Sequence, residues 1–176
     1  MGNMQNKIAL IITGLLLLPA LSVAGGEPLP IEGHEAANVM LEQLYAGSQC
    51  GDTNGDSASW IATSGQLNSV YQNLRKGKIG GPELKAPKVN FKQEGVLVIS
   101  MGQQRTGGYG VKLHDETLAV EGNRAIVKIL WLEPAPGAIQ IQVITSPCLL
   151  VKVPLGSYSR IEVVDQTRTK RFELEI

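Results

Sequence analysis

The residues best suited to nucleophilic chemistry in this chain are its two cysteines and two histidines, Cys50, Cys148, His34 and His114. A thiol enzyme needs a base beside the sulfur and a third group that orients the base. His114 would be the base for Cys148, but no third residue stands at a recognisable spacing. Asp115 does not fill this role, because neighbours on a strand point to opposite faces. A thiol enzyme based on Cys148 therefore stays an alternative rather than the main hypothesis.

Motifs of the common enzyme classes are not found elsewhere in the sequence. It contains neither the G-x-S-x-G elbow nor the H-E-x-x-H motif, and its cysteines lack zinc spacing. The stretch DTNGDS, residues 52–57, resembles the start of a calcium loop, but Ser57 and Thr63 stand where an EF-hand needs glycine and glutamate. We therefore expect a solvated turn there, no catalytic residue, no metal site and no cofactor. Trp60 and Trp131 are expected to be core residues.

Three glycines, Gly107, Gly108 and Gly110, lie close together in the stretch QQRTGGYGVKL, residues 103–113. A phosphate-binding loop needs its glycines to lead into a helix, because the helix N-terminus attracts the anion. Here the glycines lead into a strand pattern. We therefore predict that they form the turn of a hairpin, in which the strands before and after them pair with each other.

Residues 1–24 have the pattern of a secretory signal peptide. Lys7 is the only charged residue there, an apolar run follows at residues 8–21, and Ser22-Val23-Ala24 supplies small residues for cleavage. An uncleaved anchor is disfavoured, because this run of 14 residues is shorter than the ~20 that span a bilayer. We expect a periplasmic or secreted protein without stable membrane insertion after cleavage.

Export has a consequence for the cysteines, because an oxidising compartment favours a disulfide between Cys50 and Cys148. With 97 residues between the two cysteines, the chain-entropy estimate of the stabilisation is ~4 to 5 kcal/mol.

The charge balance limits the class of partner. Removal of residues 1–24 leaves 15 basic and 16 acidic residues, a net charge of −1. Nucleic acid and anionic membranes are bound by clustered Lys and Arg. The composition therefore argues against both.

The N-terminal half of the mature chain contains the one clear helix. Residues 25–35 are rich in Gly and Pro and are expected to form a flexible lead-in to a single domain at 36–176. Residues 36–46 fit a helical face and a strand equally, so both remain open. Thr63 and Gln66 form a T-x-x-Q capping box, and an amphipathic stripe follows that ends at a glycine.

Strand patterns dominate the rest of the chain. They are GVLVISMG (95–102), residues 109–113, RAIVKILWLE (124–133), AIQIQVIT (138–145), LLVKVP (149–154), RIEVVD (160–165) and RFELEI (171–176). In AIQIQVIT the apolar residues alternate with glutamines, which is typical of a strand with one solvated face. The patterns predict an α+β fold, mainly antiparallel β, as a small β-sandwich or sheet with one packed amphipathic helix.

The stretch VLVISMGQQRTGGYGVKL, residues 96–113, resembles the signature of the PrcB-like family, in which an apolar strand is followed by Gly, a basic residue, Thr-Gly-Gly-Tyr and another apolar strand. Three further segments resemble elements of this family: PKVNF (87–91), the turn PAPG (134–137) and QVITSPCLLVKVP (142–154). Together they cover residues 87–164, about half of the mature chain. Within 36–176, this range is the best-matched core.

The family is named for an accessory subunit of a secreted bacterial protease complex. The resemblance therefore implies a non-catalytic, exported module that binds a protein partner, such as a protease, or stabilises an envelope complex. The sequence departs from the family at Asn90, where Asp is expected, and at Cys148, which replaces an aromatic residue. No cysteine lies near the cleavage site, so membrane anchoring through a lipid is not implied.

The candidate partner-binding residues are Arg105, Thr106, Gly107, Gly108 and Tyr109. Their forked donor, hydroxyl and amphipathic ring are groups that interfaces use. The simpler interpretation is that Tyr109 belongs to the core and Arg105 bonds nearby carbonyls. A protease inhibitor that inserts the 105–109 hairpin loop into a cleft is an alternative function. The oligomeric state is left open.

Overall fold

The structure is a computed structural model that describes residues 39–51, 54–76 and 84–176. All of these residues lie in one unit of the chain, residues 34–176. Some predictions fall outside the described residues, namely the signal peptide (1–24), the lead-in (25–35) and the glycine at the end of the helix (Gly77).

Ten strands and one helix make up the described part of the chain. In chain order they are β1 (Val39–Met40), β2 (Glu42–Gly47), β3 (Ser57–Ile61), α1 (Ser64–Lys76), β4 (Glu94–Ser100), β5 (Gly110–Leu113), β6 (Thr117–Glu121), β7 (Arg124–Leu132), β8 (Cys148–Pro154), β9 (Arg160–Val164) and β10 (Lys170–Glu175). Across the described ranges, no helix has the length and apolar character that a membrane crossing requires.

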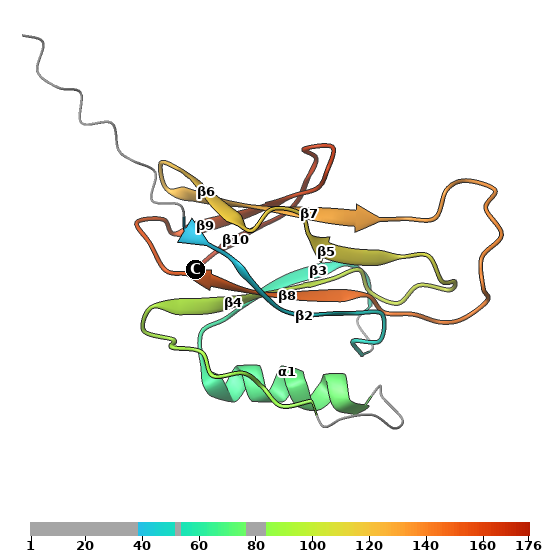
Figure 1. Ribbon diagram of the computed structural model, residues 1–176, viewed down its shortest axis with the longest axis horizontal. Coiled ribbons are helices and arrows are strands. Elements are labelled where there is room, and N and C mark those ends of the chain that lie inside the picture. Colours follow the sequence, from blue (N-terminus) through green and yellow to red (C-terminus); the bar gives the residue numbers. More distant parts are fainter. Residues whose placement is uncertain (1–38, 52–53, 77–83) are drawn as a thin grey trace, which may run out of the picture. The chain divides into compact units, whose positions relative to one another are not determined.

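The strands form two sheets, which Figure 1 shows as separate layers. One sheet has six strands in the order β1-β6-β7-β9-β10, with β5 also paired to β7. The other has four strands in the order β2-β8-β4-β3. Every neighbouring pair is antiparallel except β7 and β9, which are parallel. The prediction of mainly antiparallel β structure with one helix is confirmed.

The two sheets share a hydrophobic core, because alternate residues of each strand point to the same side. In β7 the buried residues are Ala125, Val127, Ile129 and Trp131, and the residues between them are more exposed. They pack in one cluster with residues of the four-stranded sheet. The cluster includes Leu97, Ile99, Leu149, Val151 and Val153 from that sheet, with Trp60 packed against it. The predicted core position is confirmed for Trp131, which is buried, whereas Trp60 is half-buried and packs against the core.

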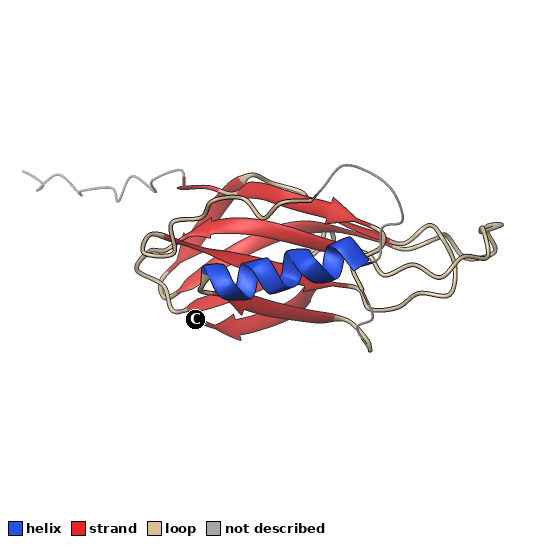
Figure 2. Ribbon diagram, turned by 90° about the horizontal axis from the view of Figure 1, so that it is seen from below, coloured by secondary structure: helices blue, strands red, loops and turns tan. Residues whose placement is uncertain are grey.

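Helix α1 packs on the opposite face of the four-stranded sheet, and Figure 2 shows it lying over the strands. The N–H of Gln66 donates to Thr63 Oγ1 at 3.2 Å, so the predicted capping box forms. The side-chain Gln66 Oε1 accepts from the Ala62 N–H at 3.0 Å. The stripe of α1 and the sheet face it covers form a second cluster, which contains Leu67, Tyr71, Leu74, Val96, Cys148 and Leu150.

The open choice between helix and strand at 36–46 is settled for the residues that are described, because β1 and most of β2 lie there. Of the expected turn at 52–57, residues 52 and 53 lie outside the described residues, and the prediction is wrong at its last position, Ser57. Residues 54–56 are exposed and outside any strand, but Ser57 begins β3, whose five residues pair with β4. The strand forms because Trp60 and Ile61 at its end pack onto the two clusters.

The predicted glycine hairpin is wrong. Strand β4 pairs with β3 and β8, whereas β5 pairs with β7 in the other sheet. The segment with the glycines therefore crosses from one sheet to the other and does not turn back on its own strand. A strand pattern on each side of a glycine cluster is equally compatible with a hairpin and with a crossover, since it does not specify the pairing partner.

The predicted strand at 138–145 is also wrong. Strand β8 begins only at Cys148, and its neighbours β2 and β4 end opposite that residue, at Gly47 and Ser100. A strand needs partners for its backbone groups, and none continues alongside 138–144. Thr145 forms only an isolated bridge, with Gln104.

The turn between β9 and β10 is organised by one buried carboxylate, that of Asp165. Its Oδ1 accepts from the N–H groups of Thr167 at 2.8 Å and Thr169 at 3.0 Å, and its Oδ2 accepts from Arg171 Nε at 2.8 Å. Burial raises the pKa of Asp165, but the hydrogen bond that the Thr167 hydroxyl donates to Oδ1 at 2.7 Å, together with the three bonds above, outweighs burial and lowers the pKa to about 2.

Candidate partner-binding site

Two loops leave the same end of the two sheets. The first, residues 101–109, leads from β4 to β5, and the second, residues 133–147, leads from β7 to β8. The two loops start and end at paired residues. In the four-stranded sheet the end of β4 lies opposite the start of β8, and in the six-stranded sheet Gly110 at the start of β5 lies opposite Leu132 at the end of β7. The loops therefore cross between the sheets together and extend past the strand ends, at the right of Figure 1. We call residues 101–109 and 133–147 the loop pair.

Hydrogen bonds hold the two loops of the pair together. The N–H of Gln104 donates to the carbonyl of Thr145 at 2.7 Å, and the N–H of Thr145 donates back at 2.9 Å. The Gly107 N–H donates to the carbonyl of Ile141 at 2.9 Å, and Thr145 Oγ1 donates to the carbonyl of Thr106 at 3.2 Å. The second loop is thus fixed to the first at Ile141 and Thr145, although neither loop forms a regular strand there.

The glycines allow this close approach of the two loops. Gly108 has a φ of 91°, which residues with side chains rarely adopt. A Cβ at this position would lie 2.5 Å from Gln140 Oε1 and 3.3 Å from Pro134 Cβ. Of the three clustered glycines, only Gly108 uses a positive φ; the φ values of Gly107 and Gly110 are not positive.

All five candidate partner-binding residues lie in the first loop, but they do not share one environment. Arg105 is exposed, and the half-buried Thr106 contributes its carbonyl to the bond with the second loop. Tyr109 is half-buried and packs against the core that the two sheets share. Its interpretation as a core residue is therefore confirmed. A binding role for residues 105–109 stays a prediction.

The most unusual side chains of the loop pair lie in the second loop and were missed by sequence reasoning. Ile139 is 101% exposed, Ile141 77%, Ile144 60% and Val143 44%. The alternation with glutamine predicts a strand with a buried apolar face, but no layer of the described protein covers that face. The sequence signal that could have identified them is Ile144, which breaks the alternation.

The cysteines form a disulfide, as predicted. The Cys50 and Cys148 sulfurs are 2.00 Å apart and the Cα atoms 5.8 Å apart. Cys148 is only 2% exposed and packs in the cluster beneath α1. A thiolate at Cys148 is therefore not available while the disulfide is intact, which argues against the thiol-enzyme alternative.

His114 and Asp115 lie in the turn after β5 and do not act as a pair. His114 is exposed, whereas the carboxylate of Asp115 accepts from the Thr117 N–H at 2.9 Å and pairs with Lys128 Nζ at 3.0 Å. The bond from Thr117 and the charge of Lys128 lower the pKa of Asp115. These contacts fix the turn structurally.

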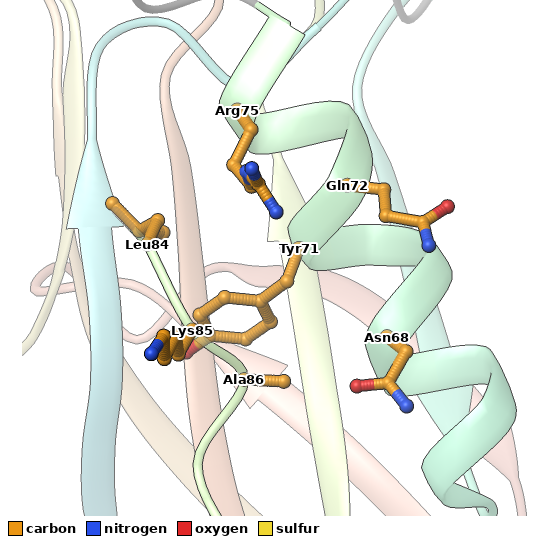
Figure 3. A pocket seen from close by; sticks show the side chains of 7 residues that line it. All are labelled: Asn68, Tyr71, Gln72, Arg75, Leu84, Lys85 and Ala86. Carbon is orange, nitrogen blue, oxygen red and sulfur yellow. The ribbon is translucent and has the colours of Figure 1, made fainter. Parts of the chain in front are cut away.

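A cavity of about 330 Å³ lies between α1 and the segment 84–86. Figure 3 shows the ring of Tyr71 reaching from the helix toward this segment, with Arg75 and Lys85 at the edges. Burial raises the pKa of the Tyr71 hydroxyl, which is therefore neutral at physiological pH. Among the described residues, no group of three or more His, Cys, Asp and Glu is placed to hold a metal ion.

One comparison with known proteins gave a match. Residues 96–154 match the family model described as PrcB C-terminal. The matched residues make up about a third of the chain. The matched range begins in β4 and ends with β8, so it contains both loops of the loop pair. It lies inside the range 87–164 over which the sequence resembles this family. Curated proteins and solved structures gave no match.

Proposed function

We propose that this chain, with its PrcB-like C-terminal segment at residues 96–154, is an exported, non-catalytic accessory protein that binds an extracytoplasmic protease or its complex. The family name supports an accessory role in a protease complex, and the signal-peptide pattern at 1–24 supports export. We further propose that the loop pair is the surface that contacts the partner.

The observation that carries this proposal is the group of exposed apolar side chains at residues 139–144. Single exposed apolar residues are common on protein surfaces, but neighbouring ones mark interaction sites. Here Ile139, Ile141, Val143 and Ile144 occur within six residues, in a loop that backbone hydrogen bonds hold in place.

The scaffold favours tight contact because it fixes the loops before binding. The two sheets share one core, and we infer that they form a β-sandwich from whose end the loop pair projects. A loop that is ordered in the free protein loses less conformational entropy on binding. Exposed Arg105 in the first loop adds a forked donor beside the apolar residues of the second.

The test is capture of a protease by the tagged full chain from the envelope of its native host, measured as co-purified proteolytic activity and by mass spectrometry. The variant Ile139→Ser/Ile144→Ser should reduce capture at least about tenfold, since each buried isoleucine at an interface contributes more than ~1 kcal/mol. Arg105→Ala should weaken capture by a smaller factor.

The matched control is Leu155→Ser, which removes a side chain that is 45% exposed in the loop between β8 and β9. Circular dichroism should be unchanged for all three variants. Equal capture by the double variant and the control would show that the loop pair is not the contact surface. Capture without any protease would contradict the accessory role.

A further inference from the structure

We propose that residues 139–143 pair with the same residues of a second copy of this chain, as a two-fold symmetric pair of antiparallel strands. The inference goes beyond the proposed function and rests on different observations, namely the unpaired backbone of this segment and the symmetry of its sequence. The partner that the surface fits is therefore another molecule of the protein itself.

One edge of the segment is occupied and the other is open. The Ile141 carbonyl accepts from Gly107 in the first loop, so this residue faces inward. Successive residues of an extended chain point their backbone groups to opposite edges, so those of Gln140 lie on the edge away from the first loop. Those of Gln142 reach the same edge when the local turn closed by the bond from the Val143 N–H to the Ile141 carbonyl straightens. Within the part of the chain that is described, no hydrogen bond engages the backbone N–H or C=O of either glutamine.

The sequence of the segment is self-complementary. Ile-Gln-Ile-Gln-Val at 139–143 has the same pattern of apolar and amide residues in both directions. Antiparallel pairing centred on Ile141 places Gln140 opposite Gln142 of the second copy, and this pair exchanges two N–H···O bonds on each side of the two-fold axis. Ile141 then lies opposite itself, and Ile139 lies opposite Val143.

This register also places the apolar side chains where they gain most. Ile141–Ile141 and Ile139–Val143 are pairs without backbone hydrogen bonds, and in such pairs the side chains approach most closely. All three residues are exposed in the single chain. Pairing costs one local bond, that from the Val143 N–H to the Ile141 carbonyl at 3.0 Å, because the backbone must straighten at Gln142.

Self-pairing has a consequence that rests on the proposed function. The second copy covers Ile139, Ile141 and Val143, which are part of the surface proposed to contact the protease. The two associations therefore exclude each other, and the free protein keeps its apolar residues covered until the partner displaces the second copy.

The test measures the oligomeric state of the purified, exported form of the full chain by light scattering and sedimentation velocity over a range of concentrations. The wild type should form a dimer that dissociates on dilution. Ile141→Lys, which faces itself across the axis, should raise the dissociation constant at least about 100-fold, because it replaces an apolar contact by two like charges. The side chain is 77% exposed in the single chain, so the fold should persist.

Charge pairs test the register itself. A mixture of Ile141→Lys and Ile141→Glu proteins should form a one-to-one heterodimer, although each is monomeric alone. In a single chain, Ile139→Lys/Val143→Glu should stay dimeric, whereas Ile139→Lys/Val143→Lys should be monomeric. A wild type that is monomeric throughout, or two double variants that behave alike, would overturn the proposal. Self-pairing is scored by the oligomeric state and the accessory role by protease capture. A monomeric wild type that captures a protease would overturn the self-pairing alone, and a wild type that captures none at concentrations below its dimer dissociation constant would overturn the accessory role alone.

Discussion

Reduction of the disulfide between Cys50 and Cys148 should strongly destabilise the protein, mainly through the unfolded state. The two residues are 98 positions apart. For a closed loop of ~100 residues, the chain-entropy model gives a stabilisation of about 4.7 kcal/mol. This is a large part of the ~5 to 15 kcal/mol that stabilises a typical domain.

The native state itself should change little on reduction, because other bonds hold the same residues together. The Cys50 N–H donates to the carbonyl and to the Oγ of Ser146 at 3.0 and 2.9 Å, and Gly47 pairs with Cys148 in the sheet. The entropy gained by the unfolded chain is therefore the main effect. A more expanded unfolded state also exposes more surface, so the denaturant slope m should rise.

Urea unfolding with and without reductant measures both quantities, with fluorescence of the buried Trp131 and the half-buried Trp60 as the signal. The free energy of unfolding should fall by about 3 to 5 kcal/mol on reduction. The variant Cys50→Ala/Cys148→Ala is the control and should not respond to reductant. A loss below ~1 kcal/mol with an unchanged m would refute the reasoning, since the loop closure would then not constrain the unfolded chain.

Three further perturbations test the packing, the buried carboxylate and the helix cap. Gly95→Ala should lower the free energy of unfolding by at least about 2 kcal/mol in a thermal or urea melt, because the new Cβ would lie 1.9 Å from Cζ2 of Trp60. Adding Trp60→Leu to Gly95→Ala should recover part of this loss. Asp165→Asn should lower stability at pH 7 by about 2 kcal/mol. Because the pKa of Asp165 is lower in the folded state, its ionised carboxylate stabilises the fold fully at pH values above its unfolded-state pKa of 3.8. This stabilisation is lost as the pH falls through about 2. Melts of the variant should therefore lack this part of the loss of stability in acid. Thr63→Ala should cost about 1 kcal/mol by removing the cap that binds the Gln66 N–H, and an equal melt of the two proteins would contradict a role for the cap.

Local sequence patterns predicted those elements whose signals are themselves local. The capping box and apolar stripe predicted α1, and the strand patterns RAIVKILWLE and RFELEI predicted β7 and β10, because each of these signals lies within the element itself. Strands β3 and β6 were missed because SASWI and TLAVE are short and contain few large apolar residues. Their formation depends on the neighbouring strands that pair with them.

Pairing partners were the part of the fold that sequence reasoning could not predict. The strands flanking the glycine cluster have the patterns of a hairpin, yet each pairs in a different sheet. The choice is made by tertiary packing, in which the loops 101–109 and 133–147 cross together. Because the sequence does not show that the two loops lie side by side, it predicts candidate binding residues on the first loop alone. The exposed apolar residues lie on the second loop.

Residues 138–145 have the pattern of a strand but do not form one, and the reason is physical. The segment has strand-forming alternation, but the sheet that could have extended it ends at the level of Cys148. Proteins usually protect such open edges with charges, and here no charged residue occurs between Glu133 and Lys152. Local preference and global fold thus disagree in a segment that is apolar, exposed and uncharged. Disagreements of this kind are expected at functional sites, and this one is removed when the segment pairs with a strand from outside its own chain.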